Sequence, residues 1–83
     1  MANILVTGAN RGIGIEFVGQ YLNEGNEVIA TYRNENSSMD LIEMGNERSN
    51  LKLLQLDVSS NKSLNSFAEN LGDSPIDIFI NNA

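Results

Sequence analysis

The sequence contains no cysteine and no histidine. Their absence excludes disulfide bonds, thiolate nucleophiles, the common zinc ligand sets and an imidazole base, and we expect no metal site. Basic residues are also scarce, because five Lys and Arg stand against eleven Asp and Glu, for a net charge of −6. Nucleic acid is therefore not an expected partner, since binding its phosphates needs a clustered basic surface.

Long apolar runs are missing as well. The first ten residues, MANILVTGAN, have no basic segment and only a short apolar stretch. We therefore expect no signal peptide and no membrane span, and a cytoplasmic location is the default. A chain of 83 residues forms at most one small domain of marginal stability.

Short apolar runs alternate with stretches of helical spacing. The runs predict strands at residues 3–7, 28–32, 51–58 and 76–80. The helical spacing predicts helices at residues 12–24, from a Ser37–Asp40 capping box to about Gly45, and from a cap at Ser60 or Asn61 to about Gly72. This alternation is typical of an α/β fold with a parallel sheet and helices on both faces.

A glycine-rich segment, TGANRGIG, joins the first predicted strand to the first predicted helix. Such a junction forms a phosphate site, because glycines permit close approach and the unpaired N–H groups of the helix start face the anion. The nucleotide-triphosphatase loop is excluded because Ile13 stands where it needs a glycine, and GxGxxG is excluded by Asn10. A turn without a ligand is the alternative, although a simple turn needs only one glycine.

Two further motifs follow in order. Asp57 and Val58 end the third predicted strand in "LDV", and the chain closes on "NNA" at residues 81–83. Together with the TGxxxGxG pattern from Thr7 to Gly14, they make the whole sequence resemble the short-chain dehydrogenase/reductase family. The resemblance implies a Rossmann-type doubly wound parallel sheet of strand order 3-2-1-4, here incomplete.

The resemblance also implies a dinucleotide site. We expect the cofactor-binding residues to be Gly8, Asn10, Arg11, Gly12, Ile13, Gly14, Arg33, Asp57, Val58, Asn81 and Ala83. The pair of Asp57 and Val58 is implied to flank the adenine ring. Asp57 has an alternative reading as a cap of the next helix, and Asn81–Asn82 as a turn.

The choice of dinucleotide depends on the residue after the second strand. NAD-binding folds carry a carboxylate there, whereas an Arg accommodates the additional phosphate of NADP. The sequence reads "TYRNE", so Arg33 takes the place of the acid, and Arg11 adds a second cation in the loop. NADP(H) is therefore the preferred cofactor, while Glu35 keeps NAD(H) as the alternative and Arg33 could instead be a plain exposed charge.

The family's catalytic Ser and Tyr-x-x-x-Lys set has no counterpart in this sequence. Tyr21 is followed by Gly25 at the lysine position, and Tyr32 by Asn36. No catalytic residue is predicted, and both tyrosines are interpreted as packing residues.

The apolar last strand, IDIFI, would form an exposed sheet edge. We therefore expect residues 1–83 to be the front portion of a longer protein. The resemblance implies that this protein is an NADP-dependent oxidoreductase that acts on a small-molecule carbonyl or alcohol, and that the complete protein could be a homo-oligomer. By itself the chain is expected to have no turnover. The alternative is a non-catalytic nucleotide-binding module.

Overall fold

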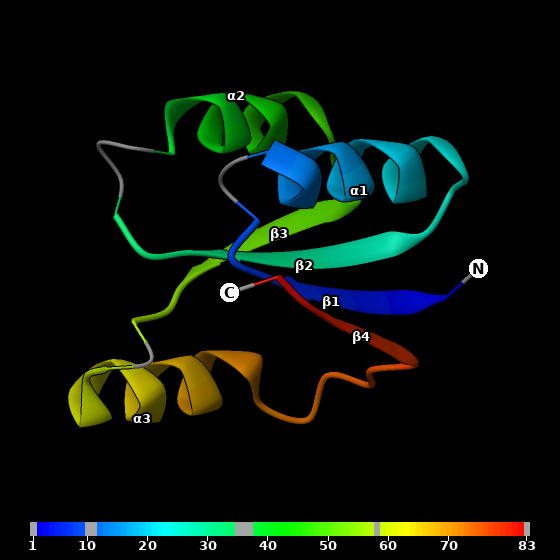
Figure 1. The fold of residues 1–83 in the computed structure, drawn as a ribbon. Helices are drawn as coiled ribbons and strands as arrows, with labels where there is room; N and C mark the ends of the chain where they lie inside the picture. The colour runs from blue at the N-terminus through cyan, green and yellow to red at the C-terminus, as the bar shows by residue number, and fades with distance from the viewer. Residues whose placement is uncertain (1, 10–11, 35–37, 58, 83) are drawn as a thin grey trace.

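The structure is a computed structural model that describes residues 2–9, 12–34, 38–57 and 59–82 (Figure 1). Every predicted strand and helix forms, in the predicted order. The elements are β1 (Asn3–Thr7), α1 (Gly12–Asn23), β2 (Glu27–Tyr32), α2 (Met39–Glu47), β3 (Leu51–Gln55), α3 (Asn61–Leu71) and β4 (Ile78–Asn81).

The strands form one parallel sheet in the order β3-β2-β1-β4. The predicted fold class and strand order are therefore confirmed. Leu5 of β1 lies between Ile29 of β2 and Phe79 of β4, which fixes the register across the centre of the sheet. The order reverses at β1, so the carboxyl ends of β1 and β4 lie side by side at the switch point where ligands bind in open α/β sheets.

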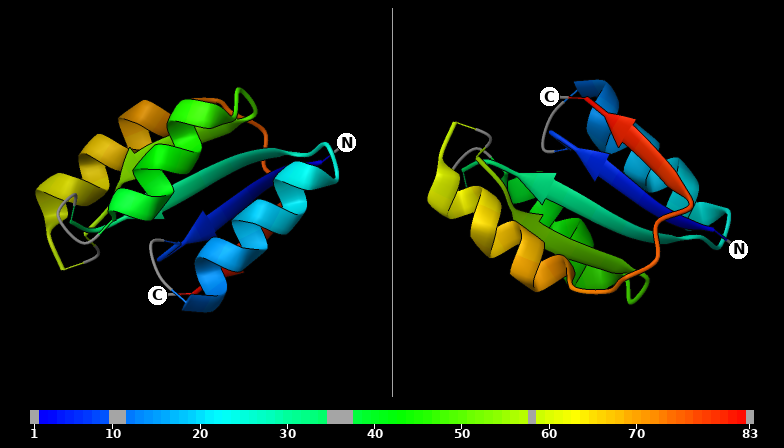
Figure 2. Two further views of the ribbon diagram at one scale, coloured as in Figure 1. Left: turned by 90° about the horizontal axis from the view of Figure 1, so that it is seen from above. Right: turned by 90° about the horizontal axis from the view of Figure 1, so that it is seen from below.

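The two faces of the sheet are covered differently (Figures 1 and 2). α1 and α2 lie together over one face, which we call the helix-pair face. Its strand residues are in the main buried cluster with side chains of both helices. The members of that cluster are Ile4, Val6, Ala9, Val18, Leu22, Val28, Ala30, Leu41 and Leu51.

The opposite face, which we call the α3 face, carries Leu5, Ile29, Leu54 and Phe79, because side chains alternate along each strand. α3 lies over it beside β3 and contributes no fully buried residue. Its N-cap is Ser60, whose side chain accepts a hydrogen bond from the Ser63 amide. The predicted cap is therefore confirmed, with Ser60 rather than Asn61.

The boundaries of α2 differ from the prediction. Ser37 lies outside the described residues, and the N-cap is Ser38, whose hydroxyl donates to the Asn34 carbonyl at 2.6 Å instead of capping the helix. Gly45 does not end the helix, which continues to Glu47. A Cβ at Gly45 would approach Leu53 Cδ1 to 2.7 Å, so this glycine lets α2 pack closely on β3.

Shifts of one to three residues occur at the boundaries of α1, β2, β3 and β4. α1 ends at Asn23 and β2 begins at Glu27, each one residue earlier than predicted, while β4 runs over Ile78–Asn81 instead of 76–80. β3 ends at Gln55 rather than at residue 58, because the Asp57 amide turns to the Ser63 hydroxyl of α3. Among the described residues, no helix is long and apolar enough to span a bilayer.

Candidate cofactor site

The glycine-rich segment lies at the carboxyl edge of the sheet, between β1 and α1. Gly8 follows β1 directly and has φ = 61°, a left-handed conformation that favours glycine. α1 begins at Gly12, and the first N–H groups of a helix have no acceptor within it. The positive end of the α1 dipole therefore opens at this edge, as an anion site requires.

The turn itself is bound to β2 through Thr31. The Gly8 amide donates to Thr31 Oγ1 at 3.1 Å, and the Ala9 amide donates to the Thr31 carbonyl at 2.9 Å. Both amides are thus engaged by the protein. An anion at this edge would therefore be bound by the amides that open α1, while Gly8 sets the course of the backbone in the turn.

The end of β4 binds the same turn from the other side. Asn82 Nδ2 donates to the Gly8 carbonyl at 3.0 Å, and Thr7 Oγ1 donates to Asn81 Oδ1 at 3.1 Å. A Cβ at Gly14 would overlap the Asn82 amide and lie 2.9 Å from the Gly8 carbonyl oxygen. Gly14 is therefore needed for close packing of α1 on β4 and on the turn, whether or not a ligand is bound.

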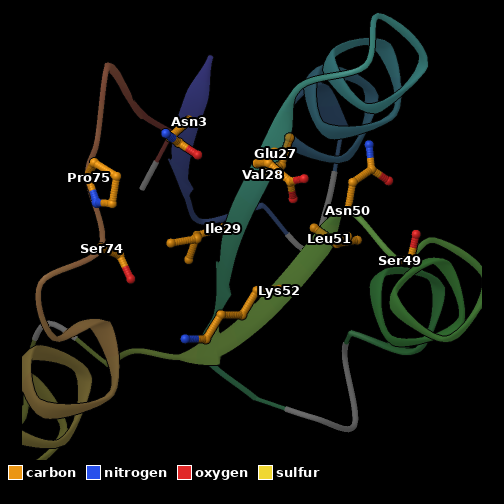
Figure 3. A pocket seen from close by; sticks show the side chains of 10 residues that line it. All are labelled: Asn3, Glu27, Val28, Ile29, Ser49, Asn50, Leu51, Lys52, Ser74 and Pro75. Atoms are coloured by element: carbon orange, nitrogen blue, oxygen red, sulfur yellow. The ribbon is translucent and has the colours of Figure 1, made fainter. Parts of the chain in front are cut away.

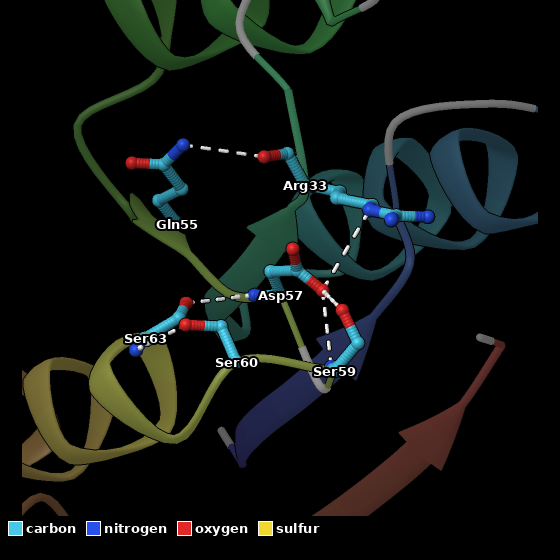
Figure 4. Close-up of polar contacts among 6 residues, drawn as sticks. All are labelled: Arg33, Gln55, Asp57, Ser59, Ser60 and Ser63. Atoms are coloured by element: carbon cyan, nitrogen blue, oxygen red, sulfur yellow. Dashed lines mark hydrogen bonds and ion pairs between the residues drawn. The ribbon is translucent and has the colours of Figure 1, made fainter.

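Arg33 and Asp57 meet at the ends of β2 and β3 (Figure 4). Arg33 Nε lies 3.7 Å from Asp57 Oδ1, and the Arg33 side chain is 73% exposed. The same carboxylate oxygen accepts hydrogen bonds from the Ser59 hydroxyl at 2.6 Å and the Ser59 amide at 3.0 Å. The Ser59 hydrogen bonds, hydroxyl first, and to a smaller degree the Arg33 charge hold the pKa of the Asp57 carboxyl below its ordinary value.

Asp57 and Asn81 do not take the alternative roles of helix cap and turn. Asp57 does not cap α3, since Ser60 does, but it closes the turn that leads into that helix. Asn81 is the last residue of β4 rather than part of a turn. The Arg33 side chain is exposed, as expected of a charged residue after a strand.

The described members of the predicted set lie at one edge, at the carboxyl ends of the strands and at the start of α1. They are Gly8, Gly12, Ile13, Gly14, Arg33, Asp57 and Asn81. Asn10, Arg11, Val58 and Ala83 lie outside the described residues, as does Glu35. Sequence reasoning missed Thr31 and the role of Asn82, since both act on a turn far away in the chain.

The opposite edge of the sheet has a hollow of its own (Figure 3). It measures about 210 Å³ and is lined by residues at the amino ends of β1, β2 and β3 and by the segment after α3, including Asn3, Glu27, Lys52, Ser74 and Pro75. It contains no predicted cofactor residue. Within the described ranges, no three acidic side chains gather in a way that could hold a metal ion.

Both tyrosines pack against the core, as interpreted from the sequence. Tyr21 and Tyr32 are partly buried against the helix-pair cluster. The Tyr21 ring also stacks on Phe17, with ring centroids 6.3 Å apart.

Comparison with known proteins agrees with this geometry. The family model described as short chain dehydrogenase matches residues 2–83. The chain belongs to the short-chain dehydrogenase family. Among curated proteins, this chain is 39% identical to the short-chain dehydrogenase/reductase atnB of Arthrinium sp, over all of this chain and 32% of that protein. It is 42% identical to (+)-neomenthol dehydrogenase of Arabidopsis thaliana, over 95% of this chain and 29% of that protein.

A solved structure shows the same fold. The NADPH-bound carbonyl reductase from chicken fatty liver superimposes with a TM-score of 0.86 at 35% identity, over all of this chain and 34% of that one. This chain thus spans about a third of the length of the relatives it matches. The family is an oxidoreductase family, and this chain shares the fold of its members.

Proposed function

We propose that this chain binds the adenosine side of NADP(H) for an oxidoreductase that transfers hydride between NADP(H) and a carbonyl or alcohol substrate. The observation that supports it best is the placing of one exposed cation, Arg33, at the end of β2 beside the glycine turn. In NAD-binding folds a carboxylate occupies that place. The NADPH-bound carbonyl reductase is a structural neighbour with this cofactor.

The residues at the edge fit the parts of such a cofactor. The amides that open α1 at Gly12 would bind the pyrophosphate, with Gly8 allowing its close approach and Asn10, Arg11, Ile13 and Gly14 completing the loop. Arg33 would bind the 2′-phosphate through charge-assisted hydrogen bonds. Asp57 and Val58 would border the adenine, and Asn81 and Ala83 the part of the site that continues beyond β4.

The chain's share of the reaction is binding and orientation. When bound, NADPH would supply the hydride to a carbonyl, or NADP⁺ would accept it from an alcohol. Tyr21 and Tyr32 are packed in the core, and neither is followed by a lysine four residues on, so no group of this chain is assigned to the proton transfer. We therefore expect the 83-residue chain to bind cofactor weakly and to have no turnover by itself.

Titration of the chain with NADPH and with NADH, followed by cofactor fluorescence, tests the proposal. We expect tighter binding of NADPH, and Arg33→Asp should reverse the order by removing the cation and adding a carboxylate. One charge-assisted hydrogen bond is worth about 1.5–3 kcal/mol, or roughly tenfold or more in affinity.

Arg48→Asp is the matched control. Its charge change is the same, but Arg48 lies at the opposite edge of the sheet, after α2, where its guanidinium donates to Asn23 Oδ1 at 2.7 Å. The control should leave the preference unchanged. Equal binding of NADPH and NADH by the wild type, or equal effects of the two substitutions, would contradict the assignment.

A further inference from the structure

Thr31 is the residue through which β2 holds the glycine turn. It is 1% exposed, and it lies opposite Leu54 near the carboxyl end of the pairing between β2 and β3. Its two oxygens accept the amides of consecutive residues, the hydroxyl that of Gly8 and the carbonyl that of Ala9. Any residue at this position would offer the carbonyl, whereas the second acceptor depends on the hydroxyl of the side chain.

We propose that Thr31 is a positioning residue for the cofactor, which fixes the Gly8 peptide so that the opening amides of α1 face the pyrophosphate. The inference rests on the proposed function. Gly8 adopts φ = 61°, and a flexible glycine samples many other conformations unless its neighbours restrain it. The Thr31 hydroxyl holds the N–H of that residue, while Asn82 holds its carbonyl oxygen.

The effect of the Thr31 hydroxyl can be measured separately from that of the Thr31 carbonyl. Thr31→Val keeps the shape of the side chain and the carbonyl that binds Ala9, so the strand pairing and the second contact stay. The Gly8 amide, however, loses its acceptor, and a backbone donor left without a partner is costly when water cannot replace it. Thr31→Ser keeps the hydroxyl and is the matched control.

The test uses the 83-residue chain and three probes, namely NADPH, ADP and adenosine 2′-monophosphate. For Thr31→Val we expect the dissociation constants of NADPH and ADP to rise about tenfold, because both carry the diphosphate. Adenosine 2′-monophosphate has no diphosphate, so its binding should change less than about twofold. Thr31→Ser should restore the two diphosphate ligands to near wild-type affinity.

Two results would overturn the inference. One is unchanged ADP binding in Thr31→Val. The other is an equal loss of all three ligands in Thr31→Val that Thr31→Ser does not restore, which would indicate general damage to the fold rather than positioning.

Amide hydrogen exchange in the ligand-free chain separates this inference from the proposed function. We expect the Gly8 amide to be protected in the wild type and in Thr31→Ser, and to exchange at least about tenfold faster in Thr31→Val, while the Ala9 amide stays protected. This result would show that Thr31 restrains the Gly8 peptide even if the wild type bound none of the three probes, an outcome that would refute the proposed function and with it the link to the cofactor. If Thr31→Val does not fold, exchange of the Gly8 amide in the wild type tests the inference instead. An unprotected Gly8 amide there would overturn it.

Discussion

The helix-pair face and the α3 face of the same sheet are packed to different degrees. On the helix-pair face, Ile4, Val6, Val28 and Ala30 are all buried beneath two helices. On the α3 face, Phe79 is 57% exposed, and α3 itself has no buried residue. Because burial of apolar surface is the main source of stability, we infer that the helix-pair face holds most of the folding free energy.

The difference bears on the candidate cofactor site. β1, α1 and β2 all contribute to the main buried cluster, and they also supply the glycine turn and the cation Arg33. Thr31, which restrains the turn, lies on the α3 face opposite Leu54 but is itself only 1% exposed. Asp57, by contrast, sits in the turn that leads to the loosely packed α3. We therefore expect the pyrophosphate part of the site to be more rigid than the adenine part.

The largest effect is expected from the buried centre of the helix-pair face. Leu41 of α2 is fully buried, so Leu41→Ala should lower the free energy of unfolding by about 3 kcal/mol through lost burial and a residual cavity. Urea denaturation followed by circular dichroism measures it. A loss below about 1 kcal/mol would show that this face is not the main core.

The corresponding change on the α3 face should cost less. Leu64 of α3 is 39% exposed, so Leu64→Ala is expected to lower the free energy of unfolding by about 1 kcal/mol. The same denaturation experiment gives the value. If the loss equalled that of Leu41→Ala, the two faces would contribute equally to the free energy of unfolding, which would contradict the inference that the helix-pair face holds most of it.

Phe79 lies on β4, the edge strand beside β1. Its ring is mostly in water, and Thr has a high preference for strands, so Phe79→Thr should change the stability by less than about 0.5 kcal/mol. The substitution should also reduce self-association, because it removes an apolar side chain from an edge strand. Sedimentation velocity of both forms at the same concentration measures the second effect. A destabilisation as large as that of Leu64→Ala would mean that Phe79 is buried in solution.

The smallest effect concerns Asp57, whose pKa is lowered in the folded chain. Its contribution to stability is therefore present above the pKa of the unfolded chain and is lost as the pH falls through the lowered folded value. Acidification from neutral pH should weaken the turn before α3, and Asp57→Asn should remove this part of the pH dependence. Amide exchange of Ser59 across the acid range measures it.

Asp73→Asn is the control for Asp57→Asn. It removes the same charge from an exposed turn after α3. The control should leave the pH dependence of Ser59 exchange as in the wild type. An identical profile in all three proteins would show that Asp57 does not hold the turn.

Local signals predicted the elements well and some of their ends poorly. The spacing of apolar residues was sufficient to predict each strand and helix in order, because that spacing is set by the geometry of the element itself. The end of α2 was predicted at Gly45 because a glycine often follows a helix. In the fold the helix continues past this glycine, and the absence of a Cβ there leaves room for Leu53, which lies on a different element.

The sequence by itself determined the order of the elements and the place of the glycine turn at the end of the first strand, since both depend on residues close together in the chain. Only the tertiary structure decided what holds that turn. Thr31 is 23 residues from Gly8 and Asn82 is 74 residues from it, and each reaches the turn because β2 and β4 pair with β1 on its two sides. Contacts of that kind follow from which strands become neighbours, and no local pattern in a single sequence encodes them.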